Sequence, residues 1–425
     1  MSSGDPATAR FATPFGQSEA PSPVPADRGS AAGQPLSPRQ SLALAAVCGA
    51  FGIAAWTLWV WVFSRAPAQD WMVFYTAARA YFDGSLPLIF DGEILTAALN
   101  QRFAAWLASP LNLHPWVYPP TFLLLFLPFG LPPPQASLVV FLISGFIALL
   151  AASLIYVGRG QPRWIVVFSM VLCPAVPFNV MTGQNAFFTT ALLVGGFGLL
   201  GRYPVLGGAL LGLLSFKPQL WLMVPVALLA ARQWRAFGGA AAAALMLALL
   251  SLVVFGPDIW RAWLALVSGA DGAYSAWLIN GRLNGVSVFA CVTWLGAPPG
   301  VASLAQGIAI VVAAAIVYRA FRRPGPDALQ LAVLLAATML AAPHASTSDA
   351  VLLALATSLF LAAPRREALG PAPVMLAAFV WISPLFNPPS LFRPGCLTPV
   401  LILLLLAALI AEIGDKEAPL GSVSV

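Results

Sequence analysis

The chain has 425 residues, of which 60% are hydrophobic and 8% are charged, and its formal net charge is +6 at pH 7. Soluble globular proteins carry roughly 25% charged residues, so this chain has too few to coat a water-exposed surface. The composition predicts a multispanning membrane protein. The basic residues form short clusters without a continuous basic face, which argues against a nucleic-acid-binding protein.

The two ends of the chain are polar. Residues 1–40 are rich in Pro, Ser and Ala, and we expect them to form a disordered cytoplasmic tail. A signal peptide is not expected, because the first apolar segment is long enough to span a membrane. An integral membrane domain is predicted over residues 41–413, followed by a second cytoplasmic tail at 414–425.

The apolar segments predict an all-α, polytopic bundle of about 12 transmembrane helices, within a range of about 10–13. They lie near residues 42–63, 136–157, 164–181, 185–201, 204–216, 218–231, 236–256, 301–318, 327–342, 348–363, 371–386 and 397–412. Several are shorter than the roughly 20 residues that a bilayer requires, so tilted, broken or re-entrant helices are expected. The pair 204–216 and 218–231 could form one re-entrant hairpin.

Short basic clusters separate these segments, at residues 158–163, 202, 231–235, 318–323 and 364–367. The positive-inside rule places these clusters and both termini in the cytoplasm. Two long loops, 64–135 and 257–300, then lie outside, and the first is expected to carry juxtamembrane helices near 71–83 and 93–108. The segment 118–134 is apolar but contains six prolines, which favours a juxtamembrane or re-entrant piece over a full span.

This topology places the unusual polar residues on the outer side. They are Asp70, His114, Tyr118, Gln184, Asn185, Lys217, Asp271, Asn284, His344, Asp349 and Arg393. Any chemistry is therefore predicted to be extracytoplasmic, where no nucleotide pool exists. The chain has neither a GxxxxGK nor a strand-associated GxGxxG motif, and an enzyme here would need an activated donor delivered in the membrane.

Asp70 follows the first apolar segment in the stretch SRAPAQDWMVFYTAARAYFDG, residues 64–84. An Asp before an aromatic helical stretch is typical of an N-cap, and the Asp83-Gly84 pair is typical of a helix end. A carboxylate at a lipid–water boundary beside aromatic residues also suits the deprotonation of a bound hydroxyl. Both roles are compatible.

Aromatic and amide side chains offer candidate contacts to a substrate. Tyr118, in HPWVYPP, could stack on a sugar or belong to the interfacial aromatic belt. Gln184 and Asn185 lie at a break between two predicted spans, where they could cap helix ends or bind sugar hydroxyls, because buried amides need partners. Tyr75, in the predicted helix at 71–83, is a further candidate.

Lys217 is the only lysine before Lys416, and it lies within an apolar stretch. A charge at such depth costs ~2.5–3.5 kcal/mol on insertion scales. A lipid phosphate would offset that cost, and snorkelling to the interface is the alternative. His344 and Asp349 share a predicted external turn, where they could bind phosphate, position an acceptor or cap a helix. Arg282 is a third candidate contact for a phosphate.

The four cysteines, Cys48, Cys173, Cys291 and Cys396, are far apart in or beside apolar segments. No Cys or His pair has metal-ligand spacing. We therefore expect isolated thiols rather than a disulfide bond, and neither a metal nor another cofactor is predicted.

The order of these motifs resembles glycosyltransferase family 87, a family of C-type (GT-C) membrane glycosyltransferases. The resemblance rests on DWMVFYTAARAYFDGSLPLIFD, then YPP, GQN, KP and a late PH…D, over about residues 42–412. It implies transfer of a hexose, with mannose as the first candidate, from a polyprenyl-phosphate sugar to an acceptor hydroxyl on a lipid or glycan. The reaction would invert the anomeric carbon at the outer face of a bacterial plasma membrane.

The resemblance also implies roles for single residues. It matches Asp70 to the family's general base, Lys217 to its KP lysine and His344 to its late histidine. The sequence departs from the family at Phe90, where Tyr is expected, and at Trp71, where Phe is usual. These departures bear on the identity of the sugar.

Two other classes of function remain open at the level of sequence. A secondary transporter also has about 12 spans and broken helices, although no two-halves repeat is evident and the polar residues collect on one face. A non-catalytic membrane protein that handles lipids or glycans is the third class.

Overall fold

The structure is a computed structural model that describes residues 35–154, 163–268, 285–322, 328–363, 369–386 and 396–415. Within these ranges the regular elements are α-helices and short 3-10 helices (η), without a strand. The predicted all-α architecture is therefore confirmed. The basic cluster 364–367, most of the cluster 158–163 and most of both predicted tails lie outside the described residues.

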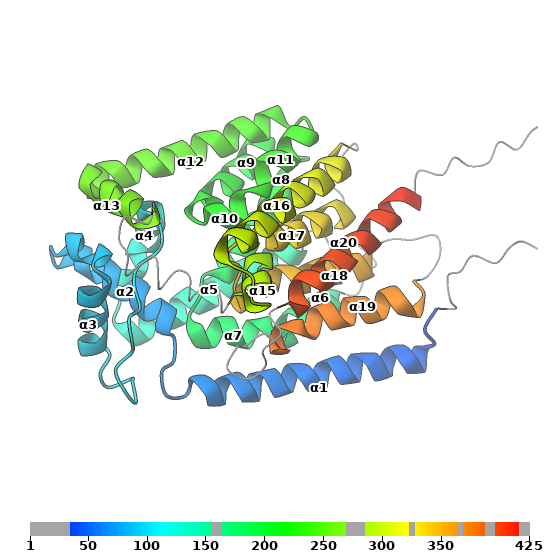
Figure 1. Cartoon of the computed structure of the whole chain (residues 1–425), viewed down its shortest axis with the longest axis horizontal. Helices are drawn as coiled ribbons and strands as arrows, with labels where there is room; N and C mark the ends of the chain where they lie inside the picture. Colours follow the sequence, from blue (N-terminus) through cyan, green and yellow to red (C-terminus); the bar gives the residue numbers. More distant parts are fainter. Residues whose placement is uncertain are drawn as a thin grey trace, which may run out of the picture.

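Among the residues that the structure describes, four helices are long and apolar enough to cross a membrane. They are α1 (Pro38–Phe63), α5 (Pro134–Leu154), α12 (Trp234–Phe255) and α16 (Pro299–Phe321). Each exposes large apolar side chains, such as Ile143 on α5 and Val253 on α12, which suits contact with lipid. In Figure 1, α1 and α12 lie along opposite long edges of the molecule, with shorter helices between them.

Shorter apolar helices occupy the remaining predicted spans. They are α6 (Arg163–Leu172), α7 (Ala175–Thr182), α8 (Ala186–Leu199), α9 (Pro204–Leu213), η3 (Leu214–Phe216), α10 (Pro218–Trp221), α11 (Met223–Ala230), α17 (Ala328–Ala341), η4 (Thr347–Ala350), α18 (Val351–Ala362), α19 (Pro371–Ile382), η5 (Ser383–Phe386) and α20 (Leu397–Asp415). Pro174 and Pro218 coincide with the breaks between α6 and α7 and between η3 and α10, because proline cannot donate the helical hydrogen bond. The number of membrane crossings stays a prediction.

The interior is built around α17 and α18, whose side chains are almost all buried. α17 packs against α16, α18 and α20. α9 lies directly on α12, because Gly208 and Gly212 leave no side chain between the two backbones. A Cβ on Gly208 would overlap the carbonyl of Ala236. Small residues at such a contact let two apolar helices approach closely.

The loop 64–135 carries α2 (Gln69–Phe82), η1 (Leu86–Phe90), α3 (Gly92–Arg102), α4 (Pro120–Phe126) and η2 (Leu127–Gly130). The two helices predicted in this loop are thus confirmed, although the second ends at Arg102. α4 and η2 are together too short to span a bilayer, as the prolines indicated.

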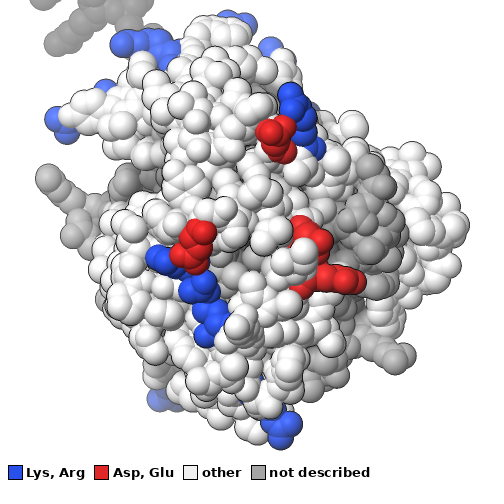
Figure 2. Space-filling model, turned by 90° about the vertical axis from the view of Figure 1, so that its left-hand side faces the viewer, with Lys and Arg blue, Asp and Glu red and all other residues white. Residues whose placement is uncertain are grey.

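These elements and α13 (Pro257–Val267) gather at one end of the molecule, which we call the α2 end (Figure 1). The start of α1 and the end of α20 lie at the opposite end, as do the start of α12 and the end of α16. Figure 2 looks onto the α2 end and shows acidic and basic side chains side by side. Asp83 there accepts hydrogen bonds from Arg79 at 2.6 Å and from Arg102 at 3.2 Å.

One sequence expectation about the cysteines is wrong. Cys291, in α15 (Val288–Trp294), and Cys396, just before α20, form a disulfide bond across 105 residues. The fold brings these two segments together, and the spacing of cysteines in the sequence carries no information on that contact. Cys48 and Cys173 are free thiols, as expected.

Candidate functional site

The first turn of α2 is held against the turn that follows α7. Ala68 adopts a left-handed conformation, with φ of 54°, and its backbone N–H donates to the Met181 carbonyl at 2.6 Å. Gly183, with φ of +71°, ends α7, and a Cβ there would overlap the Trp71 side chain. Only glycine fits this position without strain, so the GQN turn can lie directly beneath α2.

Asp70 is in the first turn of α2 and is not its N-cap. The N-cap is Ala68, whose methyl side chain offers no acceptor, and the backbone N–H of Ala68 donates to the Met181 carbonyl. A carboxylate in a first helical turn still gains ~0.3–1 kcal/mol from the helix dipole. The predicted helix end is confirmed, since Asp83 is the C-cap and Gly84 has φ of 73°.

Asp70 has a partner in His114, which the sequence analysis counted among the unusual polar residues without giving it a role in the site. His114 Nε2 lies 3.2 Å from Asp70 Oδ1, and both side chains keep about a quarter of their surface exposed, 25% and 27%. The backbone N–H of His114 donates to Thr96 Oγ1 at 2.9 Å, which fixes the histidine against α3. The chain has two histidines in all, and this scarcity is the signal that could have singled His114 out.

A second cluster surrounds Lys217, at the bend between η3 and α10. Lys217 Nζ donates to Asp349 Oδ1 at 2.6 Å and to Asn185 Oδ1 at 3.1 Å. The side chains of Lys217 and Asp349 are 5% and 2% exposed. Asp349 Oδ2 also accepts from the Ser346 N–H at 3.1 Å in a capping box at the start of η4. The chain itself therefore supplies the anion that the buried lysine requires.

Tyr118 joins the two clusters. Its hydroxyl donates to Gln184 Oε1 at 3.2 Å, and its ring packs on Phe74 and Phe122. The charges of Lys217, Asp349 and Asp70 all act on this hydroxyl. Burial raises the pKa of Tyr118, and the Lys217 ammonium opposes part of that rise.

The Asn185 side chain presents its amide nitrogen beside the Tyr118 hydroxyl. Asn185 Oδ1 accepts from Lys217, whereas Asn185 Nδ2, close to the Tyr118 hydroxyl, makes no hydrogen bond of ordinary geometry with any described residue. A buried donor without a partner costs about 1–3 kcal/mol. The geometry suits an incoming acceptor atom such as a sugar hydroxyl oxygen.

The other predicted site residues lie elsewhere. Tyr75 packs on Trp71 and Phe103, and its hydroxyl donates to the Pro132 carbonyl at 2.9 Å, beside the Arg79–Asp83–Arg102 cluster. His344 is half-buried in the turn between α17 and η4, five residues before Asp349. Arg282, and with it Asp271, Asn284 and Arg393, lies outside the described residues.

The site thus combines residues from separate parts of the chain. Asp70 and His114 are partly exposed at the surface. A more deeply buried cluster continues from them and consists of Tyr118, Gln184, Asn185, Lys217 and Asp349. Within the described ranges, no group of three or more His, Cys, Asp or Glu side chains could hold a metal ion.

The sequence model of glycosyltransferase family 87 matches residues 116–343, which is more than half of the chain. The chain belongs to glycosyltransferase family 87. Membership makes it a membrane glycosyltransferase. Four residues of the candidate site lie within the matched range: Tyr118, Gln184, Asn185 and Lys217. The other three, Asp70, His114 and Asp349, lie outside it. Neither the curated proteins nor the solved structures contain a match to this family 87 member.

Proposed function

We propose that this family 87 member transfers a hexose, mannose in the first instance, from a polyprenyl-phosphate sugar to an acceptor hydroxyl on a lipid or glycan. The single observation that carries the proposal is the partly exposed Asp70–His114 pair, which lies beside a buried polar cluster in an apolar helix bundle. Such a site can receive a substrate whose tail stays in the membrane and whose sugar reaches the boundary.

Asp70 is the proposed general base. Its carboxylate takes the proton of the acceptor hydroxyl while the hydroxyl oxygen forms a bond to the anomeric carbon of the donor sugar. The bond between that carbon and the phosphate oxygen breaks, and the polyprenyl phosphate leaves with the electron pair, so the anomeric configuration inverts. A phosphate leaving group is already anionic, so a base for the acceptor is the main requirement.

His114 is the proposed positioning residue for this base. A carboxylate oxygen 3.2 Å from Nε2 requires the proton on Nε2. The hydrogen bond holds one oxygen of Asp70, and the other oxygen, which has no hydrogen-bond partner among the described residues, can face the acceptor. The hydrogen bond from the backbone N–H of His114 to Thr96 holds the main chain of His114 in place, so the imidazole starts from a fixed position beside Asp70.

Lys217 and Asp349 are proposed to position the sugar-binding groups. Each neutralises the other's charge, so the buried pair offers a donor phosphate little net attraction. Lys217 fixes the Asn185 carbonyl oxygen, which turns Asn185 Nδ2 toward Tyr118. Gln184, Asn185 and Tyr118 are the proposed contacts to sugar hydroxyls. His344 and Arg282 remain the proposed contacts to the donor phosphate, and Lys217 could join them only by leaving Asp349.

The disulfide bond supports an extracytoplasmic site in a bacterial plasma membrane. Disulfides persist in oxidising compartments such as the bacterial periplasm. Cys291 belongs to the loop 257–300, which the positive-inside rule independently places outside, and Cys396 immediately precedes the last apolar helix. The two arguments agree on which side of the membrane these segments face, with both termini in the cytoplasm.

The test is a reaction with purified protein in lipid nanodiscs. A panel of polyprenyl-phosphate sugars is offered with a glycolipid acceptor, and released polyprenyl phosphate is measured for wild type, Asp70→Asn and Asp83→Asn. We expect Asp70→Asn to lose at least ~100-fold in rate, as general-base catalysis contributes about 10²–10⁴-fold. Asp83→Asn removes another carboxylate of the same helix and should retain most activity. A near-normal rate for Asp70→Asn would overturn the assignment of the base.

A further inference from the structure

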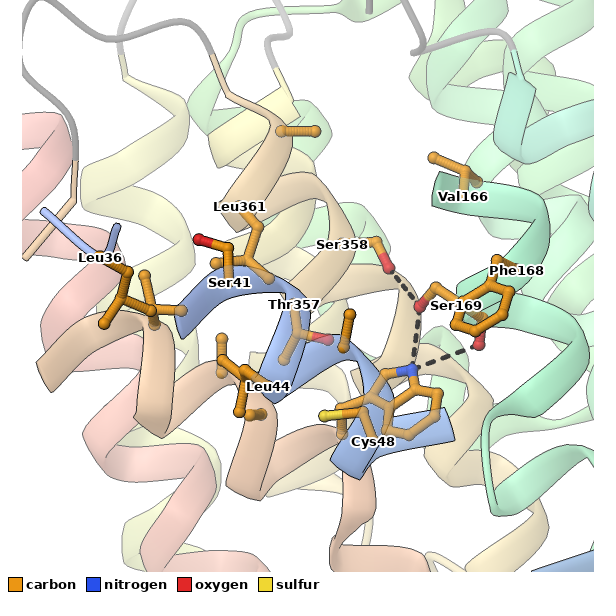
Figure 3. A pocket seen from close by; sticks show the side chains of 16 residues that line it. Leu36, Ser41, Leu44, Cys48, Val166, Phe168, Ser169, Thr357, Ser358 and Leu361 are labelled. Carbon is orange, nitrogen blue, oxygen red and sulfur yellow. Dashed lines mark hydrogen bonds between the residues drawn. The ribbon is translucent and has the colours of Figure 1, made fainter. Parts of the chain in front are cut away.

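A cavity of about 560 Å³ lies among the helices α1, α6, α18 and α19 (Figure 3). It is lined by residues in the first half of α1, including Leu44, Ala45 and Cys48, and by Val166 and Phe168 of α6. Cys48 precedes the end of α1 by 15 residues, which is roughly 22 Å of helix. The cavity is therefore separate from the Asp70 site, which follows the other end of α1.

The walls of the cavity favour an apolar ligand. Most of the lining side chains are aliphatic or aromatic, and none of the lining residues is charged. A ligand with many hydroxyl or charged groups would lose its hydration here without gaining hydrogen bonds. The volume falls within the range of about 300–1,000 Å³ that is typical of small-molecule sites.

Most of the polar groups on the wall already have hydrogen-bond partners within the protein. The Trp381 indole N–H donates to Ser169 Oγ at 2.8 Å, and Ser169 Oγ lies 2.8 Å from Ser358 Oγ (Figure 3). Thr357 Oγ1 donates to the Ala354 carbonyl at 2.9 Å. These contacts leave few donors for a ligand, so the polar atoms stabilise the wall without selecting a polar group.

The surface next to the cavity indicates which class of apolar molecule could enter it. Ala45, on its lining, belongs to an exposed apolar stretch of α1 that includes Leu42 and Val47, which are 72% and 51% exposed. Such a surface on a span-length helix suits contact with lipid chains. The N-terminal residues 1–34 are an unsuitable occupant, because they are polar and carry charged residues.

We propose that this cavity binds one hydrocarbon chain of a membrane lipid, held between α1 and the helices α6, α18 and α19. The chain could belong to a diacyl phospholipid or to a polyprenyl phosphate, because both present the same methylene-rich chemistry. The site is distinct from the proposed transferase centre and does not depend on it. A bound chain would fill a void that otherwise leaves its lining atoms without contacts.

The test uses photoreactive lipids with wild type and two matched variants. Ala45→Phe places a large ring at the cavity lining, and Ala46→Phe places the same ring on the neighbouring residue of α1, which does not line the cavity. Each protein is reconstituted with a phospholipid that carries a diazirine in its acyl chain, and separately with a diazirine polyprenyl phosphate. Crosslinked peptides are then identified by mass spectrometry.

We expect crosslinks to the first half of α1 and to α18 or α19 in at least one arm. Ala45→Phe should reduce them at least about tenfold, the equivalent of a tenfold loss of affinity, while Ala46→Phe leaves them unchanged. The arm that labels identifies the source of the chain. No labelling of these helices in either arm, or equal labelling of Ala45→Phe and wild type, would overturn the proposal. Size-exclusion profiles and unfolding temperatures of all three proteins show that each is folded.

Discussion

Asp70 and His114 are 44 residues apart in the sequence, yet Nε2 of His114 lies 3.2 Å from Oδ1 of Asp70 at the α2 end of the molecule. The histidine comes from an extended segment and the carboxylate from the first turn of a helix. Each is anchored by its own contact, His114 through Thr96 and the start of α2 through Met181. The pair is therefore set before a substrate binds, which reduces the cost of orienting the base.

Replacing His114 by Ala should lower the transfer rate by about ten- to hundredfold, because a misplaced catalytic group can cost ~100-fold. His114→Gln keeps a side-chain donor and should recover part of the loss. Steady-state rates and unfolding temperatures of wild type and both variants measure this. If the rate falls together with the unfolding temperature and His114→Gln recovers neither, the histidine is merely structural.

The buried ion pair gives a different kind of prediction. Lys217→Met should destabilise the protein by ~3–5 kcal/mol, because it leaves the Asp349 carboxylate buried without its cation. The double variant Lys217→Met/Asp349→Asn removes both charges and keeps an oxygen for the Ser346 cap, so it should recover much of the stability. Thermal unfolding in detergent measures this. A double variant that is stable but inactive would show that the ion pair positions the site. A single variant as stable as wild type would show that the ion pair contributes little to stability.

The helices were predictable because their signals are local. Apolar runs set their lengths, and the predicted boundary between 204–216 and 218–231 matches the break at Pro218. The single segment predicted at 164–181 is instead divided at Pro174 into α6 and α7. The contacts within the candidate site depend instead on packing across long separations, such as the 132 residues between Lys217 and Asp349. The sequence showed that Lys217 needed an anion but not which one. It also favoured Asp70 as an N-cap, because nothing local reveals that Met181 takes the Ala68 N–H.

Gly183 and Gly84 form a matched pair for testing the support beneath α2. Both have left-handed backbones, with φ of 71° and 73°. Gly84→Ala has no atom within 4 Å of the new Cβ, so its cost is limited to backbone strain of ~1–2 kcal/mol. Gly183→Ala adds an overlap with Trp71 and should displace the start of α2, lowering both the unfolding temperature and the transfer rate. Equal effects of the two substitutions would show that the Trp71 contact is unimportant.

The disulfide bond between Cys291 and Cys396 allows one test of protein stability and one of the side of the membrane that these two residues face. Its loss through Cys291→Ser should lower the free energy of unfolding by ~2–5 kcal/mol, since the bond closes a long loop.

In intact spheroplasts, a membrane-impermeant maleimide should label Cys291 and Cys396 only after treatment with an impermeant reductant. Cys173, buried between α6 and α7, serves as the internal control and should stay unlabelled throughout. Labelling of Cys291 or Cys396 before reduction would show that the two cysteines are not joined by a disulfide bond. If labelling requires permeabilised membranes, these two segments face the cytoplasm. That result would remove the main support for a reaction at the outer face.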